Sequence, residues 1–187
     1  MPEWAVTILL FAIAIGITIP LQRKYNEEKR NRKSPEALYA DLRKMAFEAT
    51  PETLELKDVN TALPFGVIME LGSTTGTVTV VAYIDGNASI YFNPGPIMIG
   101  GFAHPRISDA AIEWVRVSGD FIAQAEMVRA FPPPEAGYVT FHILTEGGIV
   151  RILNRESELQ DKQVDHWPLY YKGQDLITEY RLKESGG

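Results

Sequence analysis

Residues Thr77–Phe92 read TVTVVAYIDGNASIYF, and this stretch decides the fold class. From Thr77 to Ile84 the side chains alternate between two faces, one of them wholly apolar, which is typical of a half-buried strand. Asp85-Gly86 is the strongest hairpin signal in the chain, because an Asp-Gly pair suits the tight turns that join antiparallel strands. The sequence therefore predicts that Ala88–Phe92 pairs back, antiparallel, on Thr77–Ile84.

Three further segments are predicted to join this hairpin in one sheet. Gly66–Leu71 precedes it, and Tyr138–Leu144 and Ile149–Leu153 follow it, joined by a turn at Gly147-Gly148. All five strands carry apolar side chains on at least one face. We expect four of these side chains to be buried beneath a long helix: Val78, Val80, Phe141 and Ile143.

Helical patterns flank the strands. Ser34-Pro35 is a helix start, with serine as the N-cap and proline in the first turn. Its apolar face is predicted to be formed by Leu38, Leu42, Met45, Ala46 and Ala49. The longest helical pattern runs over Pro105–Ala130, includes Trp114, and is predicted to stop at Pro132–Pro134. A last amphipathic helix is expected over Asp175–Lys183.

The order of these elements predicts the α+β class for residues 35–187. We expect one five-stranded antiparallel sheet with helices on its faces. This order is similar to that of the profilin-like and roadblock-like groups, whose members mostly bind proteins or small ligands. A similar order of elements implies no particular activity.

The N-terminus has a different character. Trp4–Leu21 runs 18 residues without a charge, and as a helix it would reach about 27 Å, close to the thickness of a bilayer's hydrocarbon core. A signal peptide would carry basic residues before the apolar run, and a buried helix of a soluble protein would have a polar face. Neither feature is present, so we predict that residues 1–21 form a single transmembrane helix that contacts the lipid bilayer.

Residues 22–34 are predicted to form a basic stalk at the membrane surface. Its six cations face only Glu27 and Glu28, which leaves a net charge of +4: Arg23, Lys24, Lys29, Arg30, Arg32 and Lys33. Because basic flanks stay in the cytoplasm, the N-terminus should face out and the domain should face the cytosol of a bacterial inner membrane.

The composition excludes some classes of function. The chain has no cysteine, and its three histidines, His104, His142 and His166, show no metal-ligand spacing. No nucleophile elbow, zinc-protease or phosphate-loop motif occurs. From Pro35 onward, 12 basic and 21 acidic residues give a net charge of −9, which argues against nucleic acid as a partner. We therefore expect no catalytic residue, no metal and no cofactor.

One loop is a candidate ligand site. Between a strand and the long helix lie Gly95, Gly100, Gly101, His104 and Arg106. The glycines would allow close backbone approach, and the free amides of the helix start could hold a phosphate or carboxylate beside the two basic side chains. The alternative is that the glycines only let the loop turn tightly.

The stretch Asp85–Phe92 followed by Gly100-Gly101 resembles a pattern in a family of uncharacterised bacterial membrane-anchored proteins. In that pattern a D-G-x-x-S-[LI]-Y-F strand precedes a glycine-rich loop. The chain departs from it at Pro94 and Pro96, where small residues stand in the family. The resemblance implies a strand–loop–helix order and no activity.

Three hypotheses for function follow. The first is a membrane-tethered, cytosol-facing module that senses or binds a protein partner. The second is an accessory subunit of a larger membrane complex. The third is a ligand-binding or enzymatic domain that holds a small ligand or anion in the Gly95–Arg106 loop.

Overall fold

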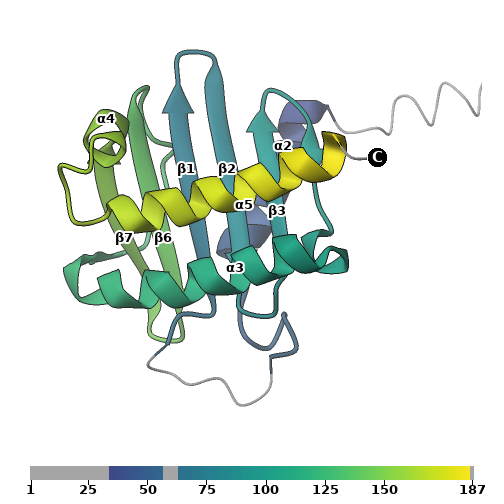
Figure 1. Cartoon of the computed structure of the whole chain (residues 1–187), viewed down its shortest axis with the longest axis horizontal. Helices are drawn as coiled ribbons and strands as arrows, with labels where there is room; N and C mark the ends of the chain where they lie inside the picture. The colour runs from purple at the N-terminus through teal and green to yellow at the C-terminus, as the bar shows by residue number, and fades with distance from the viewer. Residues whose placement is uncertain (1–33, 57–62, 186–187) are drawn as a thin grey trace, which may run out of the picture.

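A computed structural model describes residues 34–56 and 63–185 (Figure 1). The strands form one antiparallel sheet in the order β4-β3-β2-β1-β6-β7-β5. Their bounds are β1 (Gly66–Ser73), β2 (Gly76–Tyr83), β3 (Ala88–Asn93), β4 (Ile97–Met98), β5 (Glu126–Val128), β6 (Tyr138–Thr145) and β7 (Gly148–Arg155). The predicted α+β class with an antiparallel sheet is confirmed.

Both predicted hairpins are present. In the first, Ala82 pairs with Ala88, and the Asp85 carboxylate accepts a hydrogen bond from the Asn87 backbone amide at 2.9 Å, which stabilises the turn. In the second, Thr145 pairs with Gly148, so the turn itself is Glu146-Gly147 and β7 begins one residue earlier than predicted.

The helices make the molecule three layers thick. Helices α3 (Pro105–Ser118) and α5 (Trp167–Ser185) cover one face of the sheet, and α2 (Pro35–Phe47) lies on the other (Figure 1). The short helix α4 (Glu156–Gln160) follows β7. Two 3₁₀ turns flank α3 in the chain, η1 (Gly101–Ala103) before it and η2 (Gly119–Gln124) after it.

The core under α3 and α5 is the larger one. Val80, Phe141 and Ile143 are fully buried there, and Val78 is half-buried against them. Trp114 is also fully buried, and its indole nitrogen donates to the Leu169 carbonyl at 2.9 Å, which ties α3 to α5. The predicted burial beneath the long helix is thus confirmed for Val80, Phe141 and Ile143. Val78 is buried only in part.

A smaller core lies beneath α2. Tyr39, Ala46 and Phe47 pack there against Ile68, Val81 and Leu144 of the sheet. Ser34 caps this helix as predicted, since its Oγ accepts from the Ala37 amide at 3.2 Å. The predicted apolar face of α2 is confirmed in part: Leu42, Ala46 and Ala49 pack in this core, whereas Leu38 and Met45 are 40% and 66% exposed.

The predicted strand count of five is wrong, because the sheet has seven. The two additional strands are β4 and β5, which have two and three residues and form the two edges of the sheet. Segments this short carry no readable alternation, since a period of two residues shows only over about four or more.

The predicted helix over Pro105–Ala130 is also wrong in its extent. Helix α3 ends at Ser118, and Gly119 begins the 3₁₀ turn η2, after which the chain extends into β5. Glycine lowers helix stability, and Phe121 is buried from η2 rather than from a continued helix. The prolines at 132–134 therefore follow a strand and terminate no helix.

Within residues 34–56 and 63–185, no helix is both long and apolar enough to cross a membrane. The predicted span Trp4–Leu21 and the basic residues of the stalk lie outside the described residues. Their assignment stays a prediction.

Candidate functional site

The chain between β5 and β6, residues Arg129–Gly137, crosses the α2 face of the sheet, and we call it the strap. It starts beyond β7 at the sheet edge and reaches β1, where the Gly137 amide donates to the Gly72 carbonyl at 3.0 Å. A Cβ on Gly72 would lie 2.6 Å from the Pro134 carbonyl oxygen and closer still to that of Glu135. Glycine is therefore needed in β1 because the strap backbone passes directly over it.

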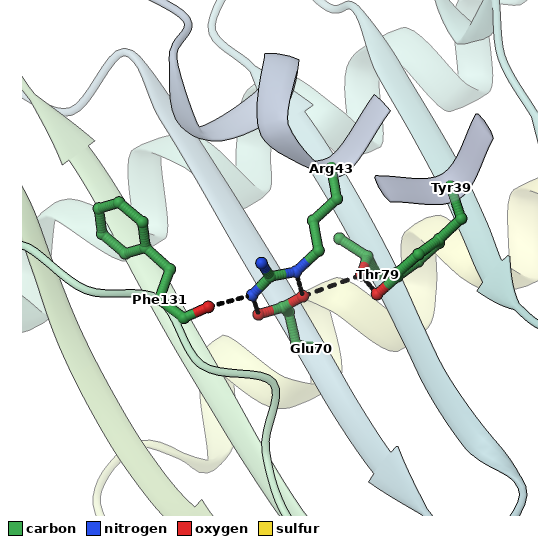
Figure 2. Close-up of polar contacts among 5 residues, drawn as sticks. All are labelled: Tyr39, Arg43, Glu70, Thr79 and Phe131. Atoms are coloured by element: carbon green, nitrogen blue, oxygen red, sulfur yellow. Dashed lines mark hydrogen bonds and ion pairs between the residues drawn. The ribbon is translucent and has the colours of Figure 1, made fainter. Parts of the chain in front are cut away.

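Arg43 joins α2, the sheet and the strap in one contact (Figure 2). Its Nε and Nη2 donate to the two carboxylate oxygens of Glu70 at 2.7 and 2.8 Å, and Nη2 also donates to the Phe131 carbonyl at 2.5 Å. The Glu70 side chain is fully buried, and that of Arg43 is 16% exposed. Such a two-pronged pair fixes the position of both side chains.

Two hydroxyl groups extend this network. Thr79 Oγ1 donates to Glu70 Oε1 at 3.0 Å, and the Tyr39 hydroxyl lies 2.9 Å from Thr79 Oγ1 (Figure 2). Because the single Thr79 hydroxyl proton is used on Glu70, Tyr39 must be the donor in the second bond. The carboxylate in the centre of the sheet is thus paired and hydrogen-bonded, as a buried charge requires.

The electrostatics of the network keep Arg43 charged. Burial alone would lower the pKa of Arg43, but the hydrogen bonds and charge of Glu70 outweigh it, and the pKa rises above its ordinary value. Burial also raises the pKa of the Tyr39 hydroxyl. Neither Arg43 nor Tyr39 is therefore poised to exchange a proton near neutral pH, and the network is suited to fixing geometry rather than to acid–base catalysis.

His142 lies beside this network, on β6. Its ring meets those of Phe47 and Phe131 edge-on, at centroid distances of 4.8 and 5.5 Å, while the two phenylalanines stack at 4.4 Å. The residue is fully buried, and neither ring nitrogen has a hydrogen-bond partner among the described residues. Burial, aided by the positive charges of Arg43 and Arg151, lowers the pKa of His142 to about 3.

Two grooves border the strap. The α2–strap groove has a volume of about 500 Å³ and combines aromatic walls with three cations and two carboxylates; its lining includes Glu36, Tyr39, Arg43, Lys44, Phe47, Glu48, Asn93, Arg129, Phe131 and Pro133. A second groove of about 400 Å³ lies between the strap and β7 and is lined by Pro132–Pro134, Tyr138, Arg151 and Leu153, among others.

The structure separates the residues of the Gly95–Arg106 candidate site. His104 and Arg106 line a third groove, of about 480 Å³, with Glu179, Leu182 and Lys183 of α5. Gly100 precedes η1 in the left-handed region (φ 81°), and Gly95 packs on Phe92 in the turn between β3 and β4. These two glycines do not line the groove of His104 and Arg106.

Gly101 has a packing role. A Cβ there would lie 2.6 Å from Ile107 Cγ2 and 2.7 Å from the Tyr180 hydroxyl oxygen. That hydroxyl donates to the Ala88 carbonyl at 2.7 Å, so Gly101 lets the loop pass beneath α5. The tight-packing alternative accounts for this glycine, whereas His104 and Arg106 are the members that face a groove.

The sequence reasoning missed Arg43, Glu70 and Thr79. The sequence did indicate a special role for Glu70, because it is the one charged residue of the apolar strand segment VIMEL. A charge buried in such a strand requires a partner. His142 was named only for its lack of metal-ligand spacing. It is fully buried on the face of β6 opposite Phe141, because Phe47 and Phe131 cover it.

Within the described part of the chain, no group of three or more histidine, aspartate or glutamate side chains could hold a metal ion. Comparison of the chain with protein-family models, with curated protein sequences and with solved structures finds no significant match. The site must therefore be interpreted from its own geometry.

Proposed function

We propose that this chain is a membrane-tethered interaction module whose partner binds in the α2–strap groove. The observation that carries the proposal is the position of Arg43, which links α2, β1 and the strap at the base of an open groove. The groove is thus built from three segments far apart in sequence and held in one geometry. Binding surfaces need such preorganisation, because it reduces the cost of ordering on association.

The lining indicates the chemistry of the partner. The half-buried Phe131, stacked on the buried Phe47, lines the groove, and Lys44 and Arg129 are exposed cations of the same lining. Aromatic and arginine side chains dominate the energetics of protein interfaces. The groove fits a protein segment that presents an apolar side chain next to a carboxylate.

The tether would bring this groove to the membrane. Helix α2 starts directly after the basic stalk, and it forms one wall of the groove. With the span Trp4–Leu21 as a single crossing and the N-terminus outside, the groove would face the cytosol close to the inner membrane. A partner in or near that membrane would meet it at a raised effective concentration.

Site-specific photo-crosslinking in intact membranes tests the proposal. A photoreactive residue is placed at Lys44 or Arg129 in the groove, and a matched control at Glu113 on α3, which is also exposed but lies on the other side of the sheet. We expect the same protein to be captured from both groove positions and not from Glu113.

Two further results decide whether the groove is the binding surface and whether the chain is a subunit of a stable complex. Equal capture from all three positions, or none from the groove, would overturn the groove as the binding surface. If the captured protein also co-purifies in fixed stoichiometry after detergent extraction without crosslinking, the chain is an accessory subunit of a stable complex rather than a transient sensor.

A further inference from the structure

Three large apolar side chains are exposed on two segments that meet near the β4 edge of the sheet. Ile99 and Phe102 follow β4 and are 63% and 64% exposed, and Leu182 in the last turns of α5 is 52% exposed. The two segments are in contact, because Gly101 packs under Tyr180 and Leu182 lines the same groove as His104. We call Ile99, Phe102 and Leu182 the edge patch.

Cations border the edge patch. Arg106 and Lys183 are exposed and line the groove beside Leu182, together with the half-buried His104 and the acidic Glu179. Arg106 also borders a second groove, which carries Asp109 and Asp175. Exposed aromatic and aliphatic side chains next to basic groups are the combination that binds a lipid interface, since the apolar groups enter the headgroup region and the cations meet phosphates.

The chain enters the domain at this same edge of the sheet. Glu36 in the first turn of α2 and Asn93 at the end of β3 line one groove, and β4 is the neighbour of β3. In Figure 1 the start of α2, in purple, and the end of α5, in yellow, both lie toward the right-hand edge. The edge patch therefore lies on the side of the domain from which the tether leads.

The length of the tether permits contact with the bilayer. Residues 22–33 would span about 40 Å if fully extended and about 18 Å as a helix. A domain of this size has a radius of gyration of about 15 Å, so the stalk allows the domain surface to reach the membrane. Tethering raises the local concentration of the edge patch at the lipid to about the millimolar range. At that concentration even a weak affinity of the patch for lipid keeps it bound.

We infer that the edge patch docks on the anionic lipid surface to which the chain is tethered, and that this contact orients the domain. The inference rests on the membrane tether of the proposed function. The domain as a whole, with a net charge of −9 from Pro35 onward, is repelled by anionic headgroups. Docking therefore depends on the local cations Arg106 and Lys183 and on the apolar side chains beside them.

Depth-dependent fluorescence quenching tests the inference on the full chain. Because the chain has no cysteine, F102C and M127C each provide a single site for an environment-sensitive dye. Met127 is the matched control, being 60% exposed on β5 at the opposite edge of the sheet. The labelled chains are reconstituted, at high dilution, in vesicles of equal parts phosphatidylcholine and phosphatidylglycerol that contain a nitroxide lipid.

We expect the dye at position 102 to be quenched at least about twofold more strongly than the dye at position 127, with a blue-shifted emission. Adding R106E and K183E to F102C should abolish the difference. Equal quenching at both positions, with the chain still floating with the vesicles, would overturn the docking and leave the tether intact. Failure of the chain to float with the vesicles would overturn the tether, and the docking with it.

A second copy of the chain is the other possible occupant of the edge patch. Quenching and blue shift at position 102 that appear only at high protein density, and not at one chain per vesicle, would assign the patch to self-association. That result would overturn the lipid contact.

Discussion

Arg43 on α2 and Glu70 on β1 form a two-pronged ion pair, at 2.7 and 2.8 Å, in which the carboxylate is fully buried in the centre of the sheet. Buried pairs of this kind add little net stability, because desolvation offsets most of the attraction, yet they are costly to break. The main contribution of the pair is therefore to fix the position of α2 on the sheet. Among the residues that the structure describes, the partners of this network all lie beyond Ser34.

Removal of residues 1–33 is accordingly expected to leave a folded, acidic, soluble domain. Ser34 caps the first helix with its own side chain, and the described residues after it already form two apolar cores. Size-exclusion chromatography and circular dichroism of residues 34–187 measure the outcome. Aggregation of this fragment in the absence of detergent would contradict the prediction.

Arg43→Met should destabilise residues 34–187 by about 3–5 kcal/mol, because it leaves the Glu70 carboxylate buried without a counter-charge. The double variant R43M/E70Q should recover more than half of this loss, since a neutral amide removes the buried charge and still accepts from Thr79. Urea unfolding measures both variants.

Lys44→Met is the control for that comparison. Lys44 is the next residue on the same helix, but its ion pair with Glu48, at 3.7 Å, is largely exposed. Its substitution should change the free energy of unfolding by only about 0–1 kcal/mol. An equal effect of Arg43→Met and Lys44→Met would show that the buried pair has no special role.

Gly72→Ala should displace the strap. The added Cβ would collide with the carbonyl groups of Pro134 and Glu135, which are backbone atoms and yield only if the strap moves, so we expect a loss of about 1–3 kcal/mol. Gly147→Ala is the matched control, because its Cβ would make an ordinary 3.7 Å contact with Thr145 Oγ1. Thermal unfolding of both variants should show a lower midpoint for Gly72→Ala alone.

The predictable parts of the fold are those that depend on residues close together in the sequence. The Asp85-Gly86 turn and the Ser34 cap depend on a few adjacent residues, and both are present in the structure. Alternation along β2 also placed Val80 on the face of the larger core, because a strand's side-chain period is fixed by its backbone.

The α2 face was not predictable in the same way. Helical periodicity favoured Leu38 and Met45 as buried, but Tyr39 and Phe47 are buried instead, since Tyr39 bonds Thr79 and Phe47 stacks on Phe131 of the strap. These partners are far from α2 in sequence. The candidate groove therefore depends on tertiary contacts that no local pattern of the chain contains.

His142 should make the stability of the domain depend on pH. Its pKa falls from an ordinary 6.5 to about 3 in the folded state, so between these values the unfolded chain binds a proton that the folded chain does not. Stability is thus fully present above about pH 6.5 and is lost as the pH falls toward the folded pKa. The expected loss from this residue alone between pH 7 and pH 5 is about 2 kcal/mol.

His142→Leu removes the titrating group while filling a similar space between Phe47 and Phe131. The difference in unfolding free energy between this variant and the parent chain should therefore grow in the variant's favour by about 2 kcal/mol from pH 7 to pH 5. Urea unfolding of residues 34–187 at the two pH values measures it, and carboxylates outside the site affect both proteins alike. A difference that stays constant between pH 7 and pH 5 would mean that His142 is accessible to protons in the folded domain, and hence that the Phe47–Phe131 cover opens readily in solution.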